Sequence, residues 1–206
     1  YATTIGANSF SNGAFTTNTG VYNIMSSEYN GGRLANPLKN FGATITGSLN
    51  SIESQTATNR YAGIANSIVG TANRTFNSNG SIVMGAGNEI TNSITTISAP
   101  SDGGNSAKAL ADNLRGAIKN SKSGGATMAL GGGNKADYTL RTSIIGVNNT
   151  ITGASGNEST NNLSIGVGNT GDKVKNTTVI GTENNITNST GTLVLGDKRT
   201  ITNANH

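Results

Sequence analysis

Short apolar runs that end in glycine recur along the chain and set its hydrophobic pattern. Each run is rich in Ile, Val and Thr, which favour β-strands. A polar turn containing Asn follows the glycine, and a second short β-prone piece follows the turn. Clear copies occupy residues 81–92, 142–153, 178–188 and 193–203. The glycines that end the runs are Gly70, Gly85, Gly131, Gly146, Gly166, Gly181 and Gly196.

The spacing of these glycines is regular. Successive glycines are 15 residues apart from Gly70 to Gly85, from Gly131 to Gly146 and twice after Gly166. Intervals of 20 residues before Gly166 and 46 residues before Gly131 indicate a bulge and an insertion. Self-similarity at a short fixed period predicts a solenoid. At roughly 3.3 Å per residue, a coil of about 15 residues holds two short strands and two turns, so we expect a narrow parallel β-roll.

The two positions before each glycine are apolar in nearly every copy. Neighbouring residues of a strand point to opposite faces of a sheet, so both faces of this strand are expected to be apolar. A two-stranded coil has an interior for only one face, and the other would form an apolar stripe too large to stay in water. This stripe predicts an obligate homo-oligomer. The core or contact positions include Val83, Met84, Ile144, Ile145, Ile165, Val179, Ile180, Val194 and Leu195.

The repeat Ser-Ile-x-x-Gly-x-x-Asn-x-Ile-Thr-Asn resembles that of the YadA-like heads of bacterial trimeric autotransporter adhesins. The copies cover residues 66–92 and 128–203, whereas the pattern fades in 10–65 and 94–126. The basic neck motif of that family is not visible. The resemblance implies an all-β, left-handed parallel β-roll, with three rolls packed around a threefold axis as a homotrimer.

The resemblance also implies a function. It predicts a non-enzymatic virulence protein exposed on the outer membrane at the bacterial cell surface. The expected role is attachment to host cells, either through receptors such as the CEACAM immunoglobulin family or through matrix proteins such as collagen or fibronectin. Membrane contact is expected only through a C-terminal anchor outside this fragment, because no stretch approaches the ~20 apolar residues of a membrane span.

We expect a single head domain over residues 1–206. Residues 1–66 are interpreted as degenerate coils with a loop, 67–93 and 127–206 as regular coils, and 94–126 as an insertion. The loop at 28–38 has Gly-Gly and Asn-Pro turn signals. It carries Tyr29 and Arg33, residue types that suit binding hot spots, although a loop that caps the open end of the roll is the favoured alternative.

Within the insertion, apolar residues at helical spacing predict one short amphipathic helix over 107–119. A helix of this length is marginal in water alone, so packing of its apolar stripe on the roll is favoured over presentation to a partner. Its basic edge could still face a receptor. That edge consists of Lys108, Arg115 and Lys119.

Composition narrows the function further. The formal charge is +4, and no basic run is interleaved with aromatics, so nucleic-acid binding has little support. The chain has no cysteine, and its only histidine is the terminal His206, which leaves little for nucleophilic catalysis. We therefore expect no enzymatic activity and no cofactor.

Two motifs suggest ligands but fit the repeat better. Residues 166–171 match GxGxxG, yet a strand-forming segment follows instead of the helix that a dinucleotide site requires. Asn88, Asn134 and Asn169 stand where calcium-binding β-rolls carry Asp, and neutral Asn lacks the charge that attracts Ca²⁺, so no metal site is predicted.

Three other interpretations stay open. The chain could be a structural β-solenoid of a fibre or tail protein, or a glycan-cleaving β-helix enzyme with carboxylates from distant coils. Ice binding is the least supported, since it requires ranks of Thr on a flat face. Thr152, Thr187 and Thr202 suggest such a rank, but charged residues interrupt it in most coils.

Overall fold

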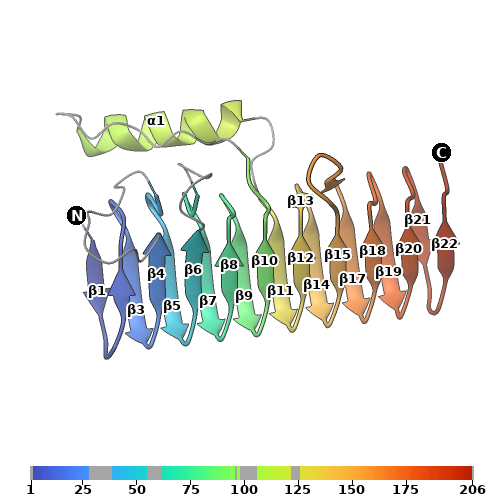
Figure 1. The fold of residues 1–206 in the computed structure, drawn as a ribbon, viewed down its shortest axis with the longest axis horizontal. Helices are drawn as coiled ribbons and strands as arrows, with labels where there is room; N and C mark the ends of the chain where they lie inside the picture. Colours follow the sequence, from blue (N-terminus) through green and yellow to red (C-terminus); the bar gives the residue numbers. More distant parts are fainter. Residues whose placement is uncertain are drawn as a thin grey trace.

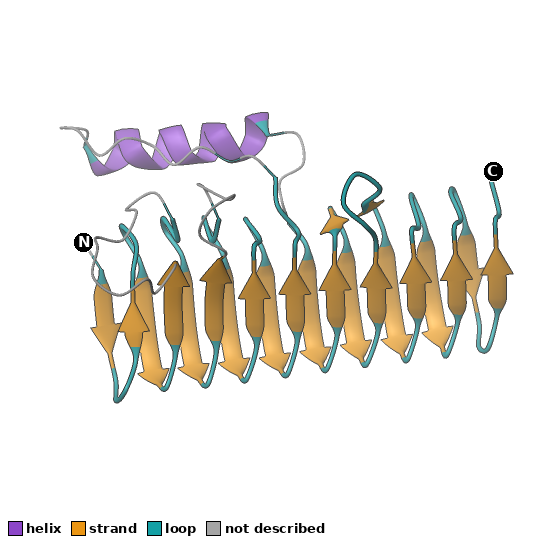
Figure 2. Cartoon of the chain, viewed as in Figure 1, coloured by secondary structure: helices purple, strands orange, loops and turns teal. Residues whose placement is uncertain are grey.

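The structure, a computed structural model, describes residues 2–27, 39–54, 62–95, 97, 106–121 and 126–205. Within these residues the chain forms a parallel β-solenoid with one α-helix (Figure 1). Each coil gives one strand to each of two 10-stranded sheets, sheet A and sheet B, which stack face to face (Figure 2). The stacked parallel sheets and the helix predicted from the sequence are confirmed.

The strands of each sheet follow one another in chain order, so each coil pairs only with its neighbours. Sheet A consists of β1 (Thr3–Ile5), β3 (Thr17–Val21), β5 (Thr44–Ser48), β7 (Ser67–Thr71), β9 (Ile82–Ala86), β11 (Met128–Gly132), β14 (Ser143–Val147), β17 (Leu163–Val167), β19 (Thr178–Thr182) and β21 (Leu193–Leu195). Sheet B consists of β2 (Phe10–Ser11), β4 (Ile24–Ser27), β6 (Ser51–Ser54), β8 (Arg74–Phe76), β10 (Glu89–Thr91), β12 (Lys135–Asp137), β15 (Thr150–Thr152), β18 (Thr170–Asp172), β20 (Asn185–Thr187) and β22 (Thr200–Thr202). A small third sheet pairs β13 (Thr139–Leu140) with β16 (Ser159–Thr160).

The hydrophobic core is a thin column between the two sheets. Ile144 of β14 and Ile151 of β15 point into it from opposite sides and are almost fully buried. Because alternate strand residues face inward, each coil needs only one or two apolar side chains for this core. The buried members are Met25, Ala43, Ile45, Ile52, Ile68, Val83, Ile90, Ala129, Ala136, Ile144, Ile151, Val174, Val179, Ile186 and Val194.

The first 66 residues stack more regularly than the sequence analysis predicts. Gly20, Gly47 and Gly70 pair in one register across β3, β5 and β7. The sequence pattern does not identify Gly20 as a repeat glycine, because the residues before it are Thr-Asn-Thr instead of an apolar run. Asn18 takes the inward position that Ile45 takes in the next coil, and it is fully buried.

The predicted helix is α1 (Ala107–Asn120), which lies along the upper edge of the roll in Figure 1. Ser106 caps it, because its side chain accepts a hydrogen bond from the backbone N–H of Ala109. The apolar stripe of α1 packs on a buried cluster of the roll, as favoured above. The residues of this contact are Leu114, Ala117 and Ile118 on α1, Phe41 and Ile64 on the roll, and Ile97 in the segment between β10 and α1.

Candidate interaction surfaces

The outer face of sheet A carries an apolar column along most of the roll. In β9, Val83 is buried, whereas its neighbour Met84 is 50% exposed. In β21, Val194 is buried and Leu195 is 61% exposed. The predicted stripe therefore divides into an inward column, which forms the core, and an outward column. We call the outward column the sheet A stripe; its members are Val69, Met84, Leu130, Ile145, Ile165, Ile180 and Leu195.

The helix leaves this stripe uncovered. The contacts of α1 lie on the cluster that includes Phe41 and Ile64, at the turns that lead from sheet B to sheet A. Met84 and Leu195 keep their exposure with the helix in place. On a single chain, then, a row of large apolar side chains faces solvent along sheet A, which is the arrangement from which the sequence analysis predicts an oligomer.

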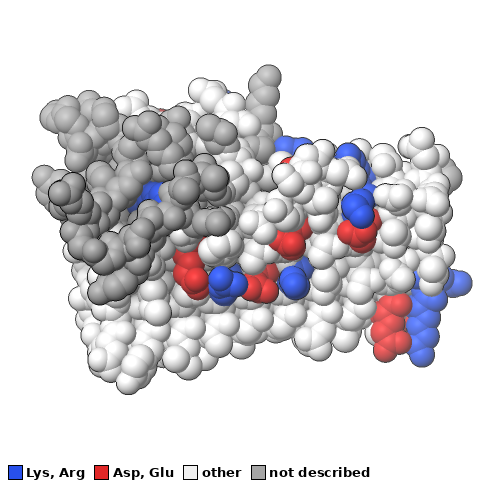
Figure 3. All heavy atoms as spheres, viewed as in Figure 1, with Lys and Arg blue, Asp and Glu red and all other residues white. Residues whose placement is uncertain are grey.

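The outer face of sheet B has the opposite character. Arg74 of β8 bridges two coils, with Nε 3.1 Å from Glu53 and Nη1 2.8 Å from Glu89. Its guanidinium also lies 5.0 Å from the ring centroid of Phe76. Figure 3 shows acidic and basic side chains gathered over the middle and right of this face. The two faces of one roll therefore differ sharply in polarity.

The Glu53–Arg74 pair perturbs the titration of both groups. Burial raises the pKa of Glu53, but hydrogen bonds from Arg74 and Ser51 and the positive charge of Arg74 outweigh burial, so the pKa lies below its usual value. The hydrogen bond to Glu53 is the main reason that the pKa of Arg74 is raised. Both groups are charged at neutral pH, and together with Glu89 they form a polar row across three neighbouring coils.

A ladder of buried asparagines runs inside the turns that follow the sheet A strands. Oδ1 of Asn149 accepts hydrogen bonds from the backbone N and from Nδ2 of Asn169, both at 3.0 Å. Nδ2 of Asn149 donates to the carbonyl of Gly166 at 2.8 Å. This pattern repeats from coil to coil and fixes their register. Its members are Asn23, Asn50, Asn73, Asn88, Asn134, Asn149, Asn169 and Asn184.

Sequence reasoning missed this ladder. It places Asn88, Asn134 and Asn169 in polar turns and gives no direction for their side chains, whereas in the structure each points inward and is at most 1% exposed. The signal was present, since Asn stands three residues after each repeat glycine from Gly70 to Gly181. The side-chain oxygens of these residues are occupied by protein donors. No group of three His, Cys, Asp or Glu residues suited to a metal ion occurs in the described part of the chain.

The repeat glycines stack directly on one another. A Cβ atom built on Gly146 would lie 1.9 Å from the carbonyl oxygen of Gly166. A Cβ atom built on Gly166 would likewise lie 1.8 Å from the carbonyl oxygen of Gly181. Both have positive φ, near 126° and 130°. The repeat glycines are therefore needed for close approach between coils. Residues 166–171 run from the end of β17 into β18, so the GxGxxG match is followed by a strand and has no helix to receive a dinucleotide.

The residues predicted to contact a receptor fall into two groups in the structure. Tyr29 and Arg33 lie outside the described residues. Lys108, Arg115 and Lys119 are on exposed positions of α1. Asp112 bridges two of them, at 2.6 Å from Lys108 Nζ and 2.6 Å from Arg115 Nη1, which partly neutralises the basic edge.

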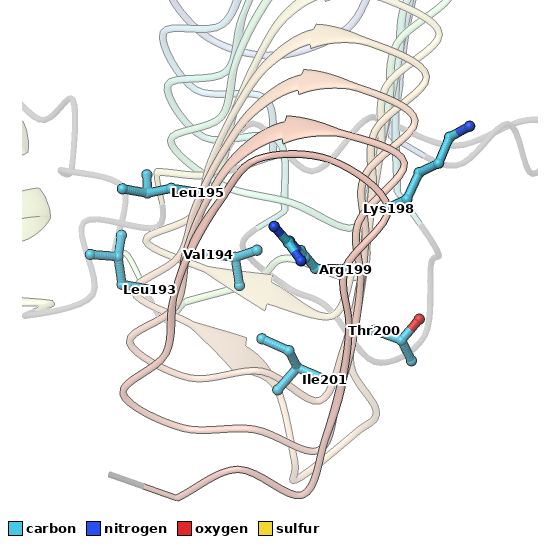
Figure 4. Close-up of a pocket in the computed structure, with 7 residues that line it drawn as sticks. All are labelled: Leu193, Val194, Leu195, Lys198, Arg199, Thr200 and Ile201. Carbon is cyan, nitrogen blue, oxygen red and sulfur yellow. The ribbon is translucent and has the colours of Figure 1, made fainter.

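The end of the roll at β21 and β22 opens as a hollow of about 500 Å³ (Figure 4). Val194 and Ile201 line it from the two strands, and Arg199 points between them. Arg199 stands where the other coils carry the ladder asparagine, and its backbone N donates to Asn184 Oδ1 at 2.9 Å. A guanidinium thus ends the ladder at this coil.

Comparison with known proteins gives no match to this chain. No family model, no curated protein and no solved structure matches the chain. No helix among the described residues is long and apolar enough to span a lipid bilayer.

One further surface was not anticipated. Among the large apolar side chains exposed in the first three coils, four lie together on the outer side of sheet B and at the corner that leads into it. Sequence reasoning missed them because the pattern around them was interpreted as degenerate. We call this surface the N-terminal apolar patch; its members are Phe10, Tyr22, Ile24 and Leu49.

Proposed function

We propose that this chain is the adhesive head of a bacterial trimeric autotransporter, a left-handed β-roll with coils of about 15 residues. Three copies pack through their sheet A stripes into a homotrimer. The head is displayed on the outer membrane and attaches the bacterium to host-cell receptors or matrix proteins. Three equivalent binding faces convert weak contacts into avidity.

The observation that carries this proposal is the contrast between the two sheets. Sheet A exposes Met84, Ile180 and Leu195, whereas sheet B exposes the Arg74 ion pairs and a series of threonines. A free, soluble roll would gain nothing from apolar residues on one long side. Covering a large aliphatic side chain is worth about 1.5–3 kcal/mol when it goes from full exposure to burial, so a row of half-exposed ones favours association strongly.

The sequence repeat and the residue types present in the described part of the chain support the adhesin role. An apolar residue followed by Gly-x-x-Asn recurs at β9, β14 and β17, with that apolar residue in the outward column described above. The described residues contain no His or Cys, and their acidic groups are spread over many coils. These features favour a binding module over an enzyme.

The first test is the mass of the purified chain by light scattering. A trimer has a mass of about 62 kDa, three times the 20.8 kDa of one chain. Met84→Asp combined with Ile180→Asp should shift the mass to that of a monomer, because three copies of each carboxylate would be desolvated at the contact. Asn185→Asp is the matched control, since it places an acid on the exposed side of sheet B. A monomeric wild-type chain at micromolar concentration contradicts the proposal.

The second test is attachment of the labelled chain to cultured epithelial cells and to immobilised collagen and fibronectin. An adhesin head binds at least one of these saturably, and binding weakens when the trimer is dissociated because avidity is lost. A roll that only spaces other parts of a fibre binds none of them.

A further inference from the structure

The N-terminal apolar patch is a continuous surface. Phe10 of β2 and Ile24 of β4 are register partners, so their side chains lie beside each other. Tyr22 and Ile24 flank the inward Asn23, which places both on the outside of the same coil. Leu49 stands at the corner next to Tyr22 in the following coil, since its N–H bonds to the carbonyl of Val21. The four are exposed by 48%, 55%, 45% and 58% in the order Phe10, Tyr22, Ile24, Leu49.

The backbone at this patch is unfavourable for the residues it carries. Tyr22 and Leu49 have φ of 55° and 60°, in the left-handed region that bulky side chains rarely adopt. The same corner carries Gly87 and Asn148 in later coils, which are types suited to it, but also Ala72, Glu183 and Lys198 with similar φ. Since neither Tyr22 nor Leu49 is buried, packing within the roll does not explain why large apolar residues occupy these corners.

The patch is also confined to one end of the roll. On the same outer positions of sheet B, the register that begins with Phe10 and Ile24 continues with polar residues. These are Ser51, Arg74, Glu89, Lys135, Thr150, Thr170, Asn185 and Thr200. On sheet A the positions equivalent to Met84 are Ile5, Thr19 and Thr46 in the first three coils, so the apolar column is interrupted by two threonines there.

This distribution argues against a second copy of the chain as the occupant. A copy aligned along sheet B would have to desolvate Arg74, Glu89 and Lys135, and ion pairs half exposed to water lose more than they gain there. The apolar surface for copies runs instead along sheet A. The patch itself holds no charged residue, and charge depletion with Tyr, Phe and aliphatic residues is the composition of a protein–protein interface core.

We propose that the N-terminal apolar patch is where the host receptor docks, and that the receptor is a protein presenting an uncharged apolar surface. This inference rests on the proposed adhesin function and adds the place and chemistry of attachment. Tyr22 and Leu49 insert into the partner as the central anchors, and Phe10 and Ile24 flank them. In a trimer each copy offers one such patch at the same end of the head.

The test uses Tyr22→Asn with Leu49→Asn in the full chain. Asn tolerates the left-handed conformation, and Asn8 and Asn148 already occupy this corner in two other coils, so the variant should fold at least as well as the wild type. Glu183→Asn places Asn at the same corner in a distant coil and is the matched control for the backbone conformation. Circular dichroism and light scattering establish that all three proteins share one fold and one mass.

The probe is a monolayer of cultured epithelial cells, titrated with fluorescent chain. We expect the wild type and Glu183→Asn to bind alike, and the double variant to bind about tenfold more weakly or worse, as for loss of two hot-spot residues. Trypsin treatment of the cells should abolish binding. Raising the salt to about 0.5 M should change the wild-type affinity less than twofold, because the patch is uncharged.

Each other outcome overturns the inference in a recognisable way. Equal binding by the double variant places the receptor elsewhere on the head. Trypsin-resistant binding, or binding to protein-free phosphatidylcholine vesicles, identifies a glycan or lipid instead of a protein. A double variant with a smaller mass than the wild type makes the patch a contact between copies. If the folded wild type binds neither cells nor matrix proteins, the adhesin proposal fails and this inference falls with it.

Discussion

Asn134 donates two hydrogen bonds to one oxygen of Asn88 across 46 residues of sequence. Its backbone N lies 3.1 Å and its Nδ2 2.9 Å from Asn88 Oδ1. Asn88 in turn donates to the carbonyl of Gly131 at 2.8 Å. The helical insertion leaves the roll within this interval, yet the ladder crosses it with the geometry of an uninterrupted coil. The insertion is therefore an addition to the edge of the roll and does not break its stacking.

The ladder makes Asn134 a sensitive point for stability. Asn134→Asp keeps the size of the side chain but loses the donors to Asn88 Oδ1 and to the carbonyl of Gly146, and it buries a carboxylate beside two oxygens. We expect it to lower the free energy of unfolding by about 3 kcal/mol at neutral pH. Urea unfolding at one fixed protein concentration measures this.

The control is the same substitution at Asn185, which is exposed and whose Oδ1 accepts from Thr170 Oγ1. Aspartate preserves that acceptor, so Asn185→Asp should change stability by less than about 0.5 kcal/mol. If both variants unfold at the wild-type urea concentration, the ladder does not stabilise the roll.

Two glycines should respond in opposite directions to alanine. At Gly146 the added methyl group would lie 1.9 Å from the carbonyl of Gly166, so the coils must separate, and we expect a loss of at least about 3 kcal/mol. At Gly116, inside α1, a Cβ meets nothing within 4 Å. Gly116→Ala should therefore stabilise the helix by about 0.5–1 kcal/mol. Thermal unfolding of both variants measures the change in melting temperature relative to wild type. A change of the same sign in both would falsify the claim that Gly146 is needed for close approach between coils.

The solenoid could be predicted because its determinants are local and repeat. The spacing of Gly131 and Gly146 gives the coil, and the alternation of Val83 and Met84 gives one buried and one exposed face. Each coil repeats the same short pattern, so a weak signal in one copy is reinforced by the next. The parallel stacking follows because identical coils can bury their apolar positions only in register.

The features that could not be predicted depend on contacts between coils. The Asn88–Asn134 bond joins residues far apart in sequence; the recurrence of Asn three residues after each repeat glycine marks the position, but it does not give the inward direction of the side chain. Gly20 follows a polar run, so its place in the stack emerges only from its pairing with Gly47. The exposure of Leu49 likewise depends on the corner conformation, which its own sequence disfavours.

The Glu53–Arg74 pair predicts a pH dependence with a defined sign. The folded pKa of Glu53 lies below the usual 4.5, because the bonds from Arg74 and Ser51 outweigh the effect of burial. Its contribution is therefore present above pH 4.5 and is lost as the pH falls through the lowered folded value. Both side chains are more than a third exposed, so solvent screening keeps the contribution below about 1 kcal/mol.

The measurement compares wild type with Glu53→Gln by urea unfolding at neutral pH and at about pH 3, where carboxyl groups of the unfolded chain are protonated. Wild type should be the more stable at neutral pH, and the difference should shrink at the lower pH, because only the wild type loses a charge at this position. Glu183→Gln serves as the control, since the ion pair of Glu183 with Lys198 spans 3.8 Å on an exposed corner and should contribute little at either pH. A difference between wild type and Glu53→Gln that stays constant or grows as the pH falls would contradict the assigned direction.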